Sequence, residues 1–383
     1  MSLTRGKYKY TILSNIREEF MKKLAILLCT STLLPTIAIS GGMERTPLPT
    51  AFMFETGGYA DFTFSNRNYD VTDNMFAPTS SMYGDVSSAA ISVKFDVNDK
   101  VAVGLAQYNQ AGIDLSYQGA GSQIPNFNIA GPLVDLEIGA LAVMGKYTVN
   151  ENFSVLGGLK RTSVADATAD IFKSVPGVTT AATVTGDSET GYIAGVAYER
   201  KDIALRIEYI VEQDVDFSLS TTGGALGPTT GNTTGSIPDY QTINFQSGVA
   251  EDTLVFGSIR RADWSNHQIA VAPQTQADPT SNFSDTTTYS IGVGRRISDE
   301  LSLSASYSFE ADSEPTGTSL LSTTDGYDTI GLGARYTLSS GTIISGGVAL
   351  TNVGDKTVTT GGVPGAFTYN SVTSYGIKLA YKF

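Results

Sequence analysis

From residue 57 onward, apolar and polar residues alternate within short segments that are separated by polar breaks. In residues 301–310, the odd positions hold Leu, Ala, Tyr or Phe, and the even positions hold Ser or Glu. Residues 203–212, 330–338 and 89–97 likewise place apolar residues at every second position. A period of two is typical of a β-strand whose two faces meet different surroundings. The pattern therefore predicts an all-β protein.

The breaks between these segments alternate in length. Tight polar turns recur roughly every fifty residues, as an outer-membrane barrel would place them, and a longer loop rich in Gly, Ser and Thr lies between each pair. About fourteen segments fit this spacing, starting near residues 58, 83, 101, 134, 153, 187, 203, 239, 253, 285, 301, 326, 342 and 367. We therefore expect residues 57–383 to form a transmembrane antiparallel up-and-down β-barrel of about 14 strands, with apolar faces toward lipid and polar faces toward the lumen.

The N-terminal region carries an export pattern. A positive segment at Met21–Lys23 precedes an apolar run at Leu24–Ile37, and small residues follow at Ala38–Ser40. This is typical of a signal peptide over 21–40 and predicts a mature chain beginning near Gly41. Together with the barrel pattern, export predicts the bacterial cell outer membrane as its location. Residues 1–20 lie upstream of a complete signal, so we interpret them as a non-native N-terminal extension. The alternative is a cytoplasmic tail before one anchor helix.

The amino-acid composition argues against several classes of function. The only cysteine is Cys29, inside the expected signal peptide, and the only histidine is His267. Such a chain favours neither a catalytic constellation nor a transition-metal site, so we expect no enzyme activity, no metal and no cofactor. Loss of residues 1–40 leaves 19 of 25 basic and 36 of 38 acidic residues, a net charge of −17. That charge argues against nucleic acid as a partner.

The last segment carries an assembly signal. Apolar or aromatic residues occupy every second position up to the terminal aromatic residue: Tyr375, Ile377, Leu379, Tyr381 and Phe383. This arrangement resembles the signal that the barrel assembly machinery recognises, so we expect that machinery to be a partner.

The segment before the first strand is too apolar for a free tail. Residues 41–56 contain Leu48, Phe52, Met53 and Phe54 after two prolines. A fourteen-strand barrel is wide enough for a solute path and narrow enough for a short plug. We therefore interpret 41–56 as an N-terminal plug segment; the alternative is that it pads the barrel rim.

This order of elements resembles the FadL/TodX-type family of outer-membrane transporters for hydrophobic compounds. Residues 41–45 and 54–59 resemble a short-plug branch of it, as do 191–200, 263–265 and 286–296. The longer plug with an Asn-Pro-Ala motif that family prototypes carry is absent here, and the large apolar outer loops are shortened. These departures weaken any assignment of fatty acid as the particular ligand.

The third strand contains polar residues at lipid-facing positions. Gln107 and Asn109 share the parity of Val101, Val103, Leu105, Ile113 and Leu115. Amides facing lipid are costly. A bulge or kink up to Gly112 would remove them and could open a gap, and the family resemblance implies a lateral exit there. A register change that exchanges the two faces is the alternative.

The resemblance implies passive uptake of hydrophobic small molecules, such as long-chain fatty acids or aromatic hydrocarbons, by a monomer in contact with outer-membrane lipid. We expect ligand contacts in an outer loop at Ile124, Phe127, Ile129 and Leu133. Further contacts are expected at the plug and lumen: Phe52, Met53, Phe54, Glu55 and Tyr59. The rival interpretations are a general diffusion porin for polar solutes and a structural or adhesive barrel.

Overall fold

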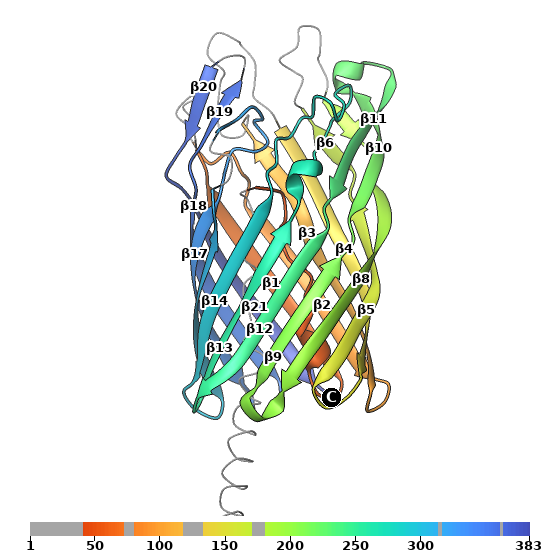
Figure 1. Cartoon of the computed structure of the whole chain (residues 1–383). Coiled ribbons are helices and arrows are strands. Elements are labelled where there is room, and N and C mark those ends of the chain that lie inside the picture. Colours follow the sequence, from red (N-terminus) through yellow and green to blue (C-terminus); the bar gives the residue numbers. More distant parts are fainter. Residues whose placement is uncertain (1–40, 73–79, 118–132, 171–180, 313–315, 361–362) are drawn as a thin grey trace, which may run out of the picture.

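The computed structural model describes residues 41–72, 80–117, 133–170, 181–312, 316–360 and 363–383. Within them, fourteen long strands form a closed antiparallel barrel (Figure 1). Each strand pairs with the next one along the chain, and β1 pairs with β21 to close the ring. The fourteen are β1 (Tyr59–Asp70), β2 (Val86–Asp96), β3 (Val101–Ser116), β4 (Leu133–Thr148), β5 (Phe153–Val164), β8 (Asp187–Arg200), β9 (Leu205–Glu212), β12 (Tyr240–Ala250), β13 (Thr253–Ala262), β14 (Thr286–Arg296), β15 (Leu301–Glu310), β17 (Tyr327–Thr337), β18 (Ile343–Val353) and β21 (Asn370–Lys382).

Shorter elements extend the wall at the end that carries the long connections. β6 (Ala167–Ala169), β7 (Ala182–Val184), β10 (Val215–Gly223) and β11 (Thr230–Ile237) join the same sheet. A separate small sheet contains β16 (Thr316–Gly317), β19 (Lys356–Thr360) and β20 (Val363–Phe367). The described helices are single 3₁₀ turns: η1 (Ala51–Phe54), η2 (Lys201–Ile203), η3 (Gly224–Leu226) and η4 (Trp264–Asn266). None of them is long and apolar enough to cross a membrane.

The two faces of the strands differ as the alternation predicts. Apolar side chains point outward and are exposed, as for Leu350 at 64% and Leu332 at 58%, whereas Ser302 and Ser345 point inward and are buried. In a closed barrel every strand has two hydrogen-bonded neighbours, so an apolar outer belt is stable in hydrocarbon. The predicted fold class is confirmed. The proposals for residues 1–40 lie outside the described residues.

The C-terminal strand closes the barrel. The N–H of Phe383 donates to the carbonyl of Gly58 over 3.0 Å, and the N–H of Gly58 donates back to Phe383 over 2.9 Å. The Phe383 ring lies 5.6 Å from the ring of Phe95 on β2. The alternate residues of the expected assembly signal all face outward and are exposed: Tyr375, Ile377, Leu379 and Tyr381.

We expect Phe383→Asp to prevent insertion of the barrel. The charge would lie on the lipid-facing side of the closing strand, next to Phe95, and it would remove the aromatic end of the expected assembly signal. The measurement is the amount of heat-modifiable protein in purified membranes. Tyr369→Asp is the matched control, because Tyr369 is 94% exposed and outside the strands. Equal amounts of folded protein for both variants would contradict the prediction.

Candidate functional site

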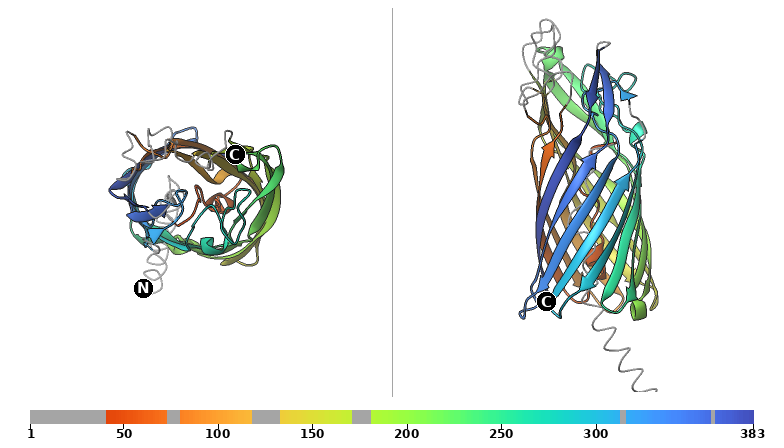
Figure 2. Two further views of the ribbon diagram at one scale, coloured as in Figure 1. Left: turned by 90° about the horizontal axis from the view of Figure 1, so that it is seen from above. Right: turned by 90° about the vertical axis from the view of Figure 1, so that its left-hand side faces the viewer.

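Residues 41–56, the N-terminal segment, run inside the ring of strands (Figure 2, left). At the end of the long loops, the carbonyl of Gly41 accepts a hydrogen bond from the N–H of Ser284 over 2.8 Å. At the end of the short turns, Glu55 pairs with Lys382 of β21 over 2.7 Å. Between these ends, Thr50 donates to Glu208 of β9 over 2.7 Å. The segment therefore extends along the interior from one end of the barrel to the other.

The predicted plug residues lie near the short turns. Phe52, Met53 and Tyr59 are buried together against the inner wall, and an added Cβ at Gly104 of β3 would lie 2.3 Å from the Met53 sulfur. The Phe54 ring lies between Lys146 and Arg206, whose cationic groups are 4.5 and 4.4 Å from its centroid. None of these residues, nor Glu55, lines the cavities described below. Their contact with a ligand stays a prediction.

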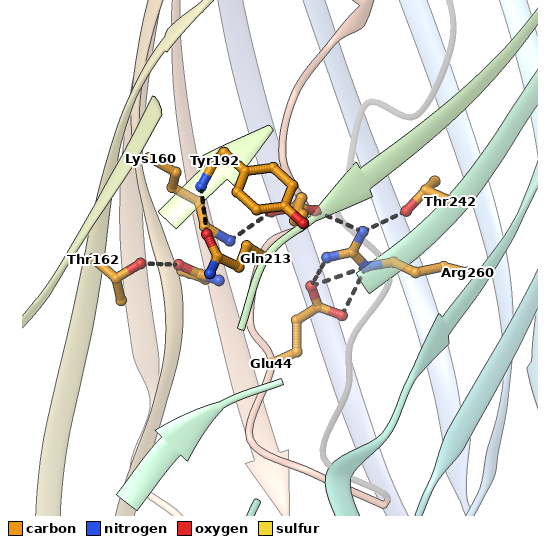
Figure 3. Close-up of polar contacts among 9 residues, drawn as sticks. Glu44, Lys160, Thr162, Tyr192, Gln213, Thr242 and Arg260 are labelled. Atoms are coloured by element: carbon orange, nitrogen blue, oxygen red, sulfur yellow. Dashed lines mark hydrogen bonds and ion pairs between the residues drawn. The ribbon is translucent and has the colours of Figure 1, made fainter. Parts of the chain in front are cut away.

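Four charged residues meet in mid-barrel and form what we call the charged layer: Glu44, Lys160, Glu212 and Arg260 (Figure 3). Arg260 Nη2 lies 2.6 Å from Glu44 Oε1, and its Nη1 lies 3.0 Å from Glu212 Oε1. The second Glu212 oxygen lies 2.7 Å from Lys160 Nζ. Lys160 and Glu212 are completely buried, and the other two nearly so.

Aromatic and amide groups surround the charged layer. The Arg260 guanidinium lies 3.9 Å from the centroid of the Tyr240 ring, an arrangement that favours a cation–π contact. Thr162 donates to Gln110 Oε1 over 3.2 Å. Among the described residues, the hydroxyls of Tyr108 and Tyr240 have no hydrogen-bond partner. Our sequence reasoning missed this layer, although its signal was present as charged residues at lumen-facing positions.

An apolar pocket of about 50 Å³ lies on the long-loop side of the charged layer. Met43 of the N-terminal segment forms part of its wall, and neighbouring strands from β4 to β11 supply most of the rest, together with Ile269, Val271 and Leu321 from connecting segments. Lining residues include Ile138, Val164, Phe217, Leu219, Ile237 and Ile269. A small apolar enclosure of this kind suits an apolar ligand.

A larger cavity of about 200 Å³ lies on the other side of the charged layer; its lining mixes apolar residues with charged ones, and we call it the polar cavity because of these charges. Glu44 and Arg260 line it, together with Asp61, Arg206 and Lys378. The cavity also reaches Ala89 and Ala90 of β2 and Asn109 of β3, as well as residues 46–51 of the N-terminal segment. The polar cavity therefore extends to the barrel wall.

The wall is interrupted between β2 and β3 at what we call the side gap, residues 86–90 and 108–113. The β2–β3 pairing ends at Ile91 and Gln107. Further along, the N–H of Gly84 donates to the carbonyl of Asp114 over 3.1 Å, which closes the gap at its far edge. No described backbone hydrogen bond joins residues 86–90 to residues 108–113.

The N-terminal segment pairs with the exposed edge of β3 at the side gap. The N–H of Arg45 donates to the carbonyl of Gln110 over 2.8 Å, and the N–H of Gly112 donates to Met43 over 2.9 Å. Gly112 has a φ of +153°, and an added Cβ would lie 2.4 Å from the Leu136 carbonyl oxygen. A glycine is needed here because residues 43–46 and β4 both approach it closely.

The register change named above as the alternative for β3 is present in the structure. A register shift between Asn109 and Ala111 exchanges the two faces of the strand, so Ile113 and Leu115 point inward and are buried. The bulge and the register change are thus one feature. Gln107 still faces outward, and Asn109 donates to Glu137 on the outer face over 3.0 Å. An extra residue on one strand moves every later side chain to the other face.

The outer-loop residues Ile124, Phe127 and Ile129 lie outside the described residues. Leu133, the fourth of that group, is the first residue of β4 and is half-buried. Its backbone exchanges hydrogen bonds with Asp170 over 2.8 and 3.4 Å. Whether these residues contact a ligand stays a prediction.

No protein-family model matches the sequence, and no curated protein matches it. Solved structures do match in shape. A Pseudomonas aeruginosa FadL homologue superimposes with a TM-score of 0.69 at 13% identity, covering 88% of this chain and 92% of that one. The toluene transporter TodX of P. putida gives 0.60 at 16% identity, covering 86% and 91%.

A third similar structure is the toluene transporter TbuX of Ralstonia pickettii. Its TM-score is 0.59 at 12% identity, covering 92% of this chain and 99% of that one. At such identities the likeness concerns the fold. This chain has the fold of the FadL/TodX-type outer-membrane channels.

Proposed function

We propose that this protein is an outer-membrane channel that carries hydrophobic small molecules from the long-loop side to the bilayer by passive diffusion. The observation that carries the proposal is an apolar pocket with a break in the barrel wall close to it. The proposal includes cleavage of 21–40, a plug formed by 41–56, and a monomeric barrel.

A third, small cavity of about 30 Å³ supports a connection between the pocket and the side gap. It shares Met43 and Leu321 with the apolar pocket. It also reaches Val86 on β2 and Gly112 on β3, one on each side of the gap. A displacement of Met43 would therefore join the apolar pocket to the wall.

The polarity of the surroundings favours exit through the side gap over passage along the barrel axis. On the straight path a ligand meets the charged layer, then a polar cavity, and then the buried Phe52 and Met53. Transfer of an apolar molecule into polar surroundings costs free energy, whereas its transfer into hydrocarbon is favourable. The side gap offers hydrocarbon directly. Two of the similar structures are toluene transporters, which supports this class of ligand.

The experiment is to fill the side gap. Ala89 is exposed on β2 and lines the polar cavity where it meets the gap, so Ala89→Trp places a large side chain there. We expect most of the protein-dependent uptake of toluene by whole cells to be lost. Ala305→Trp is the matched control, since Ala305 is exposed on β15, which has paired neighbours on both sides. Normal uptake by a folded Ala89→Trp barrel would rule out this route.

A further inference from the structure

The charged layer under the apolar pocket has no net charge. Glu212 contacts both cations, through one oxygen to Arg260 and through the other to Lys160, and Glu44 supplies the second negative charge. These residues come from three different strands and the N-terminal segment. A barrel interior with two cations could have attracted anions, but here both cations are neutralised.

The charged layer is adjacent to the apolar pocket, although none of its four residues lines the pocket. Lys160 and Val164 are both buried on the inward face of β5, and Val164 lines the pocket. Glu44 directly follows Met43, another lining residue. Because the four charged residues are buried, water screens them little, and their net charge acts on the neighbouring pocket.

We propose that Glu212 determines which charge a ligand can carry: by neutralising Lys160 and Arg260, it restricts the apolar pocket to uncharged molecules and excludes carboxylates. This inference rests on the proposed function, because it concerns the ligand of the same pocket. A carboxylate that enters the pocket loses its hydration and meets no unpaired cation in the described lining. An uncharged hydrocarbon loses no such hydration.

The test compares toluene with benzoate, which differ by a methyl group against a carboxylate on the same ring. Equilibrium binding to the purified barrel can be followed through Trp264, the only tryptophan of the chain, which is buried against Phe283 and Tyr240. Wild type is expected to bind toluene and to discriminate against benzoate. Glu212→Gln leaves one uncompensated cation, so the ratio of the benzoate Kd to the toluene Kd is expected to fall at least about tenfold.

The matched control is the double variant Lys160→Met/Glu212→Gln, which restores a neutral layer because Glu44 and Arg260 remain paired. Its ratio of Kd values is expected to return toward that of wild type. Equal shifts in the single and double variants would overturn the proposal, since they would indicate a structural effect unrelated to charge.

Wild type alone also decides the question if a variant does not insert. Binding of benzoate as tightly as toluene by wild type would overturn the role of Glu212 in selecting charge. Binding of neither molecule would instead contradict the proposed function itself. The two failures are therefore distinguishable.

Discussion

Deletion of residues 41–56 is expected to convert a closed barrel into one that conducts ions. The segment occupies the interior from Gly41 near the long loops to Glu55 near the short turns. Many inward positions of the surrounding strands are small, including Ser302, Ser304, Gly331 and Gly333, so the wall by itself cannot fill a fourteen-strand interior. Water is expected to occupy the space that the segment leaves.

The measurement is single-channel conductance in planar bilayers, with residues 1–40 kept so that export is unchanged. Phe52→Ala is the control, because it removes one buried ring and leaves the pairs Glu44–Arg260 and Glu55–Lys382 in place. The control is expected to stay closed. Large currents before the deletion would favour the porin interpretation, and a silent deletion variant would show that other residues close the lumen.

Arg260→Ala is expected to cause the largest loss of stability among single substitutions in the interior. It removes the cation that Glu44 pairs with and leaves Glu212 with Lys160 alone, and both carboxylates are buried. Removal of one partner from a buried ion pair typically costs about 3–5 kcal/mol, because the remaining charge has lost its hydration and its counter-charge. The same change is expected to loosen the N-terminal segment.

Urea titration of the folded, heat-modifiable form measures this loss of unfolding free energy. Arg200→Ala is the matched control: Arg200 also pairs with a carboxylate, at 2.7 Å from Asp202, but its side chain is 46% exposed. Water and ions already screen such a pair, so no measurable change is expected. Similar losses in the two variants would show that the charged layer contributes no more than a surface ion pair.

The strands of this protein were predictable because their information is local. Alternation of apolar and polar residues sets the two faces of residues 301–310, and the tight turn at 298–300 sets where that strand begins. The expected first residues of the strands at 101, 153, 187, 253 and 301 agree with the structure. In a closed barrel each side chain has one of two surroundings, lipid or lumen. An alternation with a period of two is therefore enough to predict most of the fold.

The contacts inside the barrel could not be predicted from the sequence, because they depend on tertiary structure. Glu44, Lys160, Glu212 and Arg260 are far apart in the chain, and only the barrel's closure and shear bring them to one level. The polar residues at 107–109 indicated an irregularity in β3. They did not reveal that residues 43–46 would replace β2 as the hydrogen-bonding partner of β3. Strand identity follows from the solvent at each face, whereas the contents of the lumen depend on which distant side chains can neutralise one another.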